Sequence, residues 1–191
     1  SEQLYKYGFG QKTYLDLYGE KAGLVPDRQW KSKTKALPWY PGETLNVGIG
    51  QGYFLATPMQ LTLATASLAN DGNTYTPHLL LGDKNNKTNE VSVYNYENNK
   101  FYTAMKDPHH LHIVKNAMWR VVNEKRVGTA SHLKKVKNIE YAGKTGTAQV
   151  YNLDKGKTGT KSLQDHALFI SYAPFESPEI VVTVVVENGG G

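Results

Sequence analysis

None of the 191 residues of the chain is cysteine. Disulfides and thiolate metal sites are therefore excluded, although this absence does not fix the cellular compartment. Long apolar segments are also missing: the longest run, IVVTVVV at residues 180–186, is far too short to span a bilayer. No signal peptide is visible in the first residues, SEQLYKYGFG. Since the ending VENGGG is also abrupt, we expect an excised piece of a larger protein.

The positive charge of the chain is scattered rather than concentrated. The formal net charge is +5, which leaves nucleic acid, anionic polymers and membrane surfaces open as partners. The charge is spread over several stretches, among them KSKTK at 31–35, KKVK at 134–137 and KGKTGTK at 155–161. Such scattered lysines are typical of a solvated face. A content of 39% hydrophobic residues is enough to bury a core.

Hydrophobic spacing predicts two helices. Apolar residues recur between 59 and 68 after Thr57-Pro58, a suitable N-cap and first helical residue, and Asp71-Gly72 should end this buried helix. A second, amphipathic pattern covers residues 111–122. Residues 1–30 are expected to form turns and brief strands, and residues 31–46 a surface loop.

The rest of the chain predicts extended structure. Residues 82–104 are polar and favour loop or short exposed strands. The last third favours strands at 139–151, 167–173 and 180–187, the last two joined as a hairpin by the turn APFESPE. Helices followed by an antiparallel sheet predict the α+β class, with the sheet flanked by helices.

The stretch EYAGKTGTAQVY at residues 140–151 contains a Gly-Lys-Thr triplet, which raises the possibility of a phosphate-binding loop. The pattern G-x-x-x-x-G-K-[ST] requires glycine at position 138, where Asn138 stands. It also requires a helix that begins at Lys144, whereas TGTAQVY favours a strand. The nucleotide interpretation therefore fails on both counts.

A Lys-Thr-Gly triplet on a strand has a different chemical use. Alternate side chains point to opposite faces, so Lys144 and Gly146 should face one way and Thr145 and Thr147 the other. Glycine lets an acyl substrate lie flat against the strand, while an amine and a hydroxyl suit a terminal carboxylate. A backbone N–H of the same strand can stabilise an oxyanion. Lys-Thr-Gly is the third motif of penicillin-binding proteins and serine β-lactamases.

Longer segments strengthen this resemblance. The chain contains YGFGQKTYLDLYGEKAGLVP, NVGIGQGYFLATPMQL, LANDG…TPHLL, VGTA, GKTGTAQV and DHALFISYAP…VVVENGG, in that order. In their order and composition they resemble the class B penicillin-binding proteins, and in particular the elongation-specific transpeptidases of Gram-negative bacteria. The similarity runs along essentially the whole chain and is weakest over residues 84–108.

The resemblance implies a partial penicillin-binding/β-lactamase-like domain, with residues 1–191 as the C-terminal portion of a transpeptidase domain. Family members cross-link peptidoglycan by serine acyl transfer on stem peptides that end in D-Ala-D-Ala, and β-lactams acylate the same serine. It further implies no cofactor or metal, no nucleic-acid partner, association of the full-length protein with the cell-elongation machinery, and a location on the periplasmic face of the inner membrane.

The resemblance also assigns roles to residues of the Lys-Thr-Gly strand. Lys144 would tune proton transfer around a serine of the family's middle motif and attract the substrate carboxylate. Thr145 and Thr147 would offer hydroxyls to that carboxylate, and the Thr147 N–H would form half of an oxyanion hole. Gly146 would keep the strand accessible, and Gln149 would lie at the rim of the cleft. Residues 152–165 would form a mobile connection.

Two of the three family motifs are missing from the sequence. S-x-x-K occurs at Ser32–Lys35, within the expected loop, and at Ser131–Lys134, after Gly128. Neither lies on an expected buried helix, and no S-x-N occurs anywhere. We therefore expect the nucleophile and middle motifs to lie upstream and this chain alone to be inactive.

Other candidate sites are weaker. Tyr53 stands where a dinucleotide fingerprint would need a glycine after Gly48, Gly50 and Gly52, so these glycines predict a tight structural loop. The histidines and carboxylates have no metal-ligand or paired-acid spacing; they are His109, His110, His112, His166, Asp16, Glu20, Asp71 and Glu187. A non-catalytic basic module that binds nucleic acid or an anionic polymer remains the alternative, because thirteen tyrosines accompany the lysines.

Overall fold

The structure is a computed structural model that describes residues 2–96, 100–102, 107–133, 136–149 and 164–190. These residues form five helices and seven strands. The helices are α1 (Glu2–Lys6), α2 (Arg28–Lys35), α3 (Pro41–Gly48), α4 (Pro58–Ala69) and α5 (Pro108–Asn123). The strands are β1 (Asn73–Tyr75), β2 (Gly82–Lys84), β3 (Val91–Val93), β4 (Lys100–Tyr102), β5 (Ala142–Ala148), β6 (His166–Ala173) and β7 (Ile180–Val186). In this part of the chain no helix is long and apolar enough to cross a membrane.

The three C-terminal strands form one antiparallel sheet in the order β5-β6-β7. Lys144 on β5 lies opposite Ile170 on β6, which in turn lies opposite Thr183 on β7. Both the predicted pairing and the α+β class are therefore confirmed, and no helix begins at Lys144. The predicted first strand also included residues 150–151, which lie outside the described residues.

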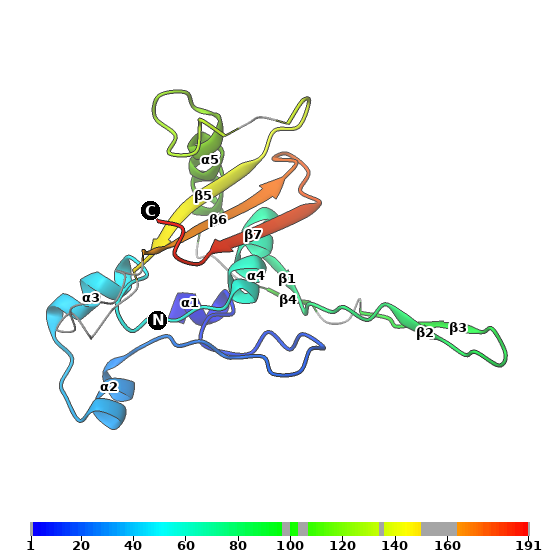
Figure 1. Cartoon of the computed structure of the whole chain (residues 1–191), viewed down its shortest axis with the longest axis horizontal. Coiled ribbons are helices and arrows are strands. Elements are labelled where there is room, and N and C mark those ends of the chain that lie inside the picture. The colour runs from blue at the N-terminus through cyan, green and yellow to red at the C-terminus, as the bar shows by residue number, and fades with distance from the viewer. Residues whose placement is uncertain (1, 97–99, 103–106, 134–135, 150–163, 191) are drawn as a thin grey trace.

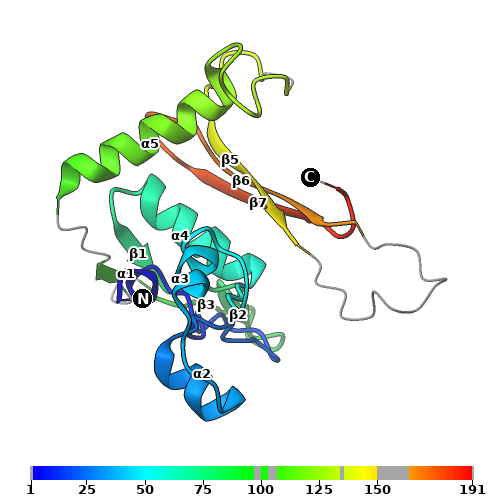
Figure 2. The ribbon, with the colours of Figure 1, turned by 90° about the vertical axis from the view of Figure 1, so that its left-hand side faces the viewer.

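Helices α4 and α5 pack against one face of this sheet (Figure 2). The core between them contains Ala69 of α4, Met118 of α5, Ala142 of β5 and Tyr172 of β6. Tyr172 is only 1% exposed, and burial raises the pKa of its phenol to about 12. In the described part of the chain its hydroxyl has no hydrogen-bond partner. The two helices therefore fix the position of the sheet through apolar contacts.

The first predicted helix is confirmed as α4, including its start. The Thr57 hydroxyl accepts the N–H of Gln60, and the Gln60 side chain accepts the N–H of Thr57, which makes a capping box. Gln60 is fully buried, and its amide group donates to the carbonyls of Gln11 and Ala22 at 2.8 and 2.7 Å. One residue thus begins the helix and holds the N-terminal segment against it. The second predicted helix is likewise confirmed as α5.

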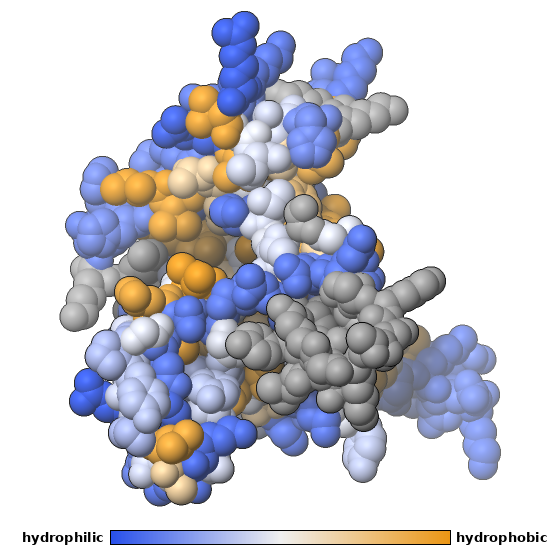
Figure 3. Space-filling view, turned by 60° about the vertical axis from the view of Figure 1, so that its left-hand side comes forward, coloured by the Kyte–Doolittle hydropathy of each residue, from blue (hydrophilic) through white to orange (hydrophobic). Residues whose placement is uncertain are grey.

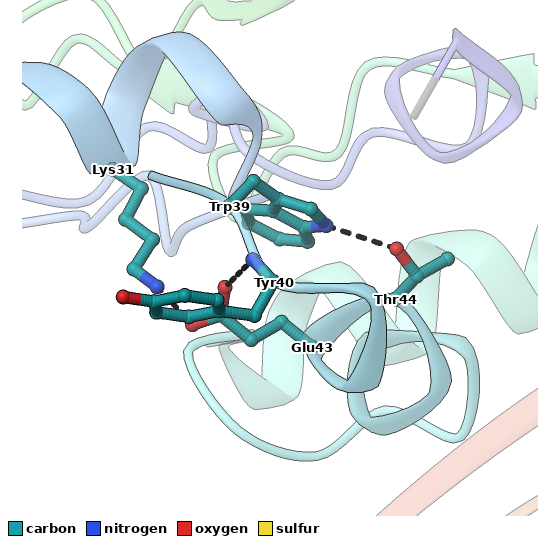
Figure 4. A network of polar contacts seen from close by, with 5 residues as sticks. All are labelled: Lys31, Trp39, Tyr40, Glu43 and Thr44. Atoms are coloured by element: carbon teal, nitrogen blue, oxygen red, sulfur yellow. Dashed lines mark hydrogen bonds and ion pairs between the residues drawn. The ribbon is translucent and has the colours of Figure 1, made fainter. Parts of the chain in front are cut away.

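The predicted surface loop over residues 31–46 is wrong, because α2 and α3 occupy most of it. Asp27 caps α2 by accepting the N–H of Trp30 at 2.7 Å. Lys31 is 2% exposed and its ammonium contacts Glu43 at 2.5 Å (Figure 4). This hydrogen bond lowers the pKa of Glu43 below its usual range. The ammonium also lies 4.3 Å from the ring centre of Tyr40, so a tertiary contact stabilises two helices that the polar sequence did not predict.

Brief strands over residues 1–30 are also wrong. The described part of this segment has α1, the start of α2 and a single antiparallel bridge between Leu24 and Leu55. Short exposed strands within residues 82–104 are confirmed, because β2 and β3 form a hairpin that extends away from the body of the molecule (Figure 1).

Apolar side chains also reach the surface. On β7, Ile180, Val182, Val184 and Val186 are exposed. A view of one side of the molecule shows apolar residues among polar ones (Figure 3). Among the described elements, no helix covers the sheet face opposite α4 and α5 (Figure 2). The described residues therefore bury only one side of the sheet.

Candidate active site

The strand β5 carries the predicted site and is anchored at its start. Ala142 is fully buried in the core, and the Asn123 side chain at the end of α5 donates to the Tyr141 carbonyl at 2.8 Å. The Trp119 indole, one turn earlier on α5, donates to Glu140 at 2.9 Å. The strand then runs from this buried start toward an exposed end, where the predicted site residues lie.

Lys144 is exposed and lies on the helix-facing side of the sheet. It shares that face with Ala142 and with Ile170, its partner on β6, which packs on the core. The Lys144 ammonium donates to the Thr145 carbonyl at 2.7 Å and lies 3.5 Å from the Thr145 hydroxyl. The amine and the hydroxyl predicted to serve one carboxylate are therefore neighbours.

Thr145 also meets a residue that the sequence did not single out. Its hydroxyl lies 3.2 Å from the hydroxyl of Thr129. Thr129 belongs to the VGTA segment after α5, in which the fully buried Ala130 donates its N–H to the Val121 carbonyl at 3.0 Å. Gly128 is required there because an added Cβ would lie 2.3 Å from that carbonyl. The VGTA segment stands out in the sequence, but nothing in the sequence showed that its Thr129 lies beside Thr145 on β5.

Thr147 lies at the free edge of β5, and Gln149 directly follows the strand on the same side. The Thr147 carbonyl accepts a hydrogen bond from the Gln51 side chain at 2.8 Å, so it is turned away from β6. The N–H and C=O of one strand residue face the same edge, so the Thr147 N–H also faces the free edge. Gly146 is exposed on the opposite face of the strand. The structure thus brings all five predicted residues to one accessible strand end.

The two serines of the S-x-x-K matches lie outside the buried helix that a nucleophile of this family would occupy. Ser32 is exposed on α2 rather than in the loop that the sequence predicted, and Ser131 lies in the turn after α5. Lys134 and most of the predicted mobile connection, 152–165, lie outside the described residues.

The remaining candidates have local roles. His109, His110 and His112 are exposed on the first turns of α5. The Nδ1 of His166 accepts the N–H of Asn188 at 3.0 Å, which ties the end of β7 back to β6. In the described ranges no group of three or more histidines and carboxylates could hold a metal.

An apolar hollow of about 160 Å³ lies elsewhere on the sheet. Its lining includes Val136, Tyr141, Ser171 and Val182. Ser171 on β6 lies opposite Val182 on β7 and is the residue after Ile170, the partner of Lys144. Since side chains alternate along a strand, Ser171 and Val182 point to the face of the sheet opposite that of Lys144. The residues that line the hollow lie beside the start of β5, and the five predicted site residues are not among them.

The chain has clear relatives in sequence. All of residues 1–191 match the family model of the penicillin binding protein transpeptidase domain. The peptidoglycan D,D-transpeptidase MrdA of Haemophilus influenzae is 41% identical over 193 residues, covering 97% of this chain and 29% of the relative. The MrdA protein of Escherichia coli is 36% identical over 197 residues, covering all of this chain and 30% of the relative. The chain thus spans under a third of the length of these curated relatives.

Solved structures agree with this assignment. The Pseudomonas aeruginosa PBP2 in complex with WCK 5153 superposes with a TM-score of 0.79 at 41% identity, covering 97% of this chain and 38% of that one. A Helicobacter pylori penicillin-binding protein (PBP2) in complex with MreC has the same TM-score at 33% identity, covering 98% and 31%. None of these names describes a nucleic-acid-binding protein, so the alternative of a basic binding module gains no support. Because the family model matches its whole length, the chain belongs to the penicillin-binding protein transpeptidase domain family.

Proposed function

We propose that this chain is the C-terminal portion of a serine-type peptidoglycan D,D-transpeptidase of the penicillin-binding protein 2 kind. The observation that carries the proposal is the free edge of β5, where Lys144, Thr145 and the Thr147 N–H lie together. The nucleophilic serine and the middle motif would come from residues upstream of Ser1.

The exposed valines of β7 support a longer protein. Val182 and Val184 lie on β7, which is the edge strand of the sheet opposite β5, and both are exposed. Their side chains stand on the sheet face opposite α4 and α5, and an exposed apolar face is a surface that proteins normally cover. We propose that upstream residues of the same protein cover it.

The proposed reaction assigns each group of the strand a distinct task. A serine Oγ attacks the carbonyl of the penultimate D-Ala, and the Thr147 N–H donates to the oxygen as it becomes negative. The hydroxyls of Thr145 and Thr147 and the Lys144 ammonium hold the terminal carboxylate. Lys144 also tunes proton transfer around the middle-motif serine, Gly146 leaves room for the substrate backbone, and Gln149 borders the cleft.

The covalent steps balance without a cofactor. Attack breaks the bond to the terminal D-Ala, which leaves as the free amino acid after its nitrogen takes up the proton released by the serine. An amine of a neighbouring stem peptide then attacks the acyl-serine, forms the new amide and returns a proton to the serine. A β-lactam enters the first step only, since its amide opens on the serine and blocks it.

The proposed setting follows the named relatives. A penicillin-binding protein 2 of Helicobacter pylori was solved with MreC, and one of Pseudomonas aeruginosa with WCK 5153. We propose β-lactams and the membrane-bound cell-elongation machinery as partners of the full-length protein. Its transpeptidase domain would then lie on the periplasmic face of the inner membrane, with an anchor outside this chain.

The test uses the complete gene. Its translation should contain S-x-x-K and S-x-[ND] upstream of Ser1, and the purified full-length protein should be labelled by a fluorescent penicillin on the S-x-x-K serine. Competition with a D-Ala-D-Ala peptide should slow the labelling. A full-length protein that has no such serine, or that binds DNA with a steep salt dependence and takes no label, would refute the proposal.

A further inference from the structure

The loop between α3 and α4 places one side chain on the free edge of the motif strand. The Gln51 amide group donates to the Thr147 carbonyl at 2.8 Å, and its oxygen lies 3.5 Å from the Gln149 N–H. A glutamine side chain ends in the same N–H and C=O groups as a peptide bond. The Gln51 side chain therefore pairs with Thr147 and Gln149, at the end of β5, as one peptide unit of a neighbouring strand would.

The backbone around Gln51 is built to hold it there. Gly50 and Gly52 on either side both have φ of +75°, a conformation that residues with a side chain rarely adopt. The Gln51 N–H donates to the Asn46 carbonyl at 2.8 Å, which fixes the residue to the end of α3. After the loop, Leu55 exchanges two backbone hydrogen bonds with Leu24. The pattern Gly-Gln-Gly thus has a geometric reason, although the sequence predicted only a tight loop.

The end of β5 needs such a contact. The pairing with β6 ends at Ala148, opposite His166, and on the free edge the groups of Thr147 face away from β6. Gly146, the residue before Thr147, adds backbone freedom at the same place. An oxyanion donor is effective only when its direction is fixed before the reaction, so a loose strand end would weaken it.

We propose that Gln51 is a positioning residue for acyl transfer, which aims the Thr147 N–H by holding the carbonyl of the same residue and the next N–H along that edge. This inference rests on the proposed transpeptidase function. Gln51 acts through the backbone of Thr147, whose carbonyl accepts its amide group. Because a carbonyl oxygen has two lone pairs, a peptide substrate can still donate to Thr147 while Gln51 stays in place.

The test measures single-turnover acylation of the full-length protein by a fluorescent penicillin over a range of ligand concentrations. Gln51→Met keeps the length of the side chain but removes both hydrogen bonds. The limiting acylation rate at saturating ligand should fall about 3- to 10-fold, the range that one neutral hydrogen bond supports. The apparent dissociation constant, the fraction of protein finally labelled and the melting temperature should stay near the wild-type values.

A second variant and a matched control separate the alternatives. Gln51→Glu keeps the acceptor for Gln149 but, as a carboxylate, cannot donate to Thr147, so its limiting rate should fall at least as far. Gln11→Met removes an exposed glutamine whose side chain donates to Tyr5 at 2.8 Å, and it should react as wild type.

The outcomes separate a failure of the proposed transpeptidase function from a failure of the proposed role of Gln51. If wild type and Gln11→Met take no label, the proposed function fails and the inference falls with it. If both react and Gln51→Met keeps the wild-type limiting rate, the inference alone is overturned. A variant that loses labelled fraction and melting temperature while the remaining protein reacts at the normal rate also overturns it, because Gln51 would then be structural.

Discussion

Replacing Lys144 with alanine removes the ammonium from the free edge of β5. In the structure this group is exposed and donates to the Thr145 carbonyl at 2.7 Å, with the Thr145 hydroxyl 3.5 Å away. The side chain buries no apolar surface in the core. Its removal should therefore change the free energy of unfolding by no more than about 0.5 kcal/mol.

The effect on acylation should be much larger. The loss of one charged hydrogen-bonding group at a reacting centre costs on the order of 2–4 kcal/mol. Since about 1.4 kcal/mol corresponds to a factor of ten in rate, acylation should slow by about 30- to 1000-fold. Thr145→Ser keeps the hydroxyl and should cost far less.

The assay is stopped-flow acylation of the full-length protein by a fluorescent penicillin, with the melting temperature measured on the same samples. Lys33→Ala, an exposed lysine on α2, is the matched control and should react at the wild-type rate. If Lys144→Ala also acylated at the wild-type rate, the site assignment would be wrong despite the family match. A large fall in melting temperature for Lys144→Ala would contradict the reasoning from burial.

Three further results are expected. The isolated chain should take no covalent penicillin label under native conditions, and an adduct on Ser32 or Ser131 by mass spectrometry would show that a nucleophile lies within it. Burial raises the pKa of Tyr172 from 10 to about 12, so the neutral phenol stabilises the fold below about pH 10 and that stabilisation is lost as the pH rises toward 12. Tyr172→Phe should therefore lose less melting temperature than wild type between pH 10 and 12, and an equal loss would argue against a buried phenol. Gly128→Ala should lower the free energy of unfolding by about 1–3 kcal/mol, because its Cβ would press on the Val121 carbonyl, and a wild-type chemical denaturation midpoint would contradict that packing.

The elements with strong local signals could be predicted from the sequence. Helix α4 has a capping box at Thr57 and Gln60, and α5 has a regular apolar face, so both were predicted within a few residues. The strands β6 and β7 are rich in apolar and β-branched residues and are joined by a short turn, which predicted their hairpin, and the Thr-rich segment of β5 predicted a third strand. These signals act between residues close in the chain, and tertiary contacts did not override them.

Helices α2 and α3 could not be predicted in the same way. Most of their residues are polar, Pro38 lies between them and Pro41 begins α3, which favours a loop when each window is considered alone. The pairing of Lys31 with Glu43 and Tyr40, across the turn between the helices, stabilises them instead. An ion pair of this kind is visible only when both partners have been placed, because either charge alone is typical of a solvated surface.

For the candidate site, the sequence by itself determined which residues share one strand and in what order. Lys144, Thr145, Gly146 and Thr147 follow one another, so their alternation across a strand is a local property of the backbone. Only the tertiary structure decided what meets that strand. Thr129 and Gln51 reach it from 16 and 96 residues away, and contacts over such separations depend on how helices and loops pack rather than on any periodicity in the chain.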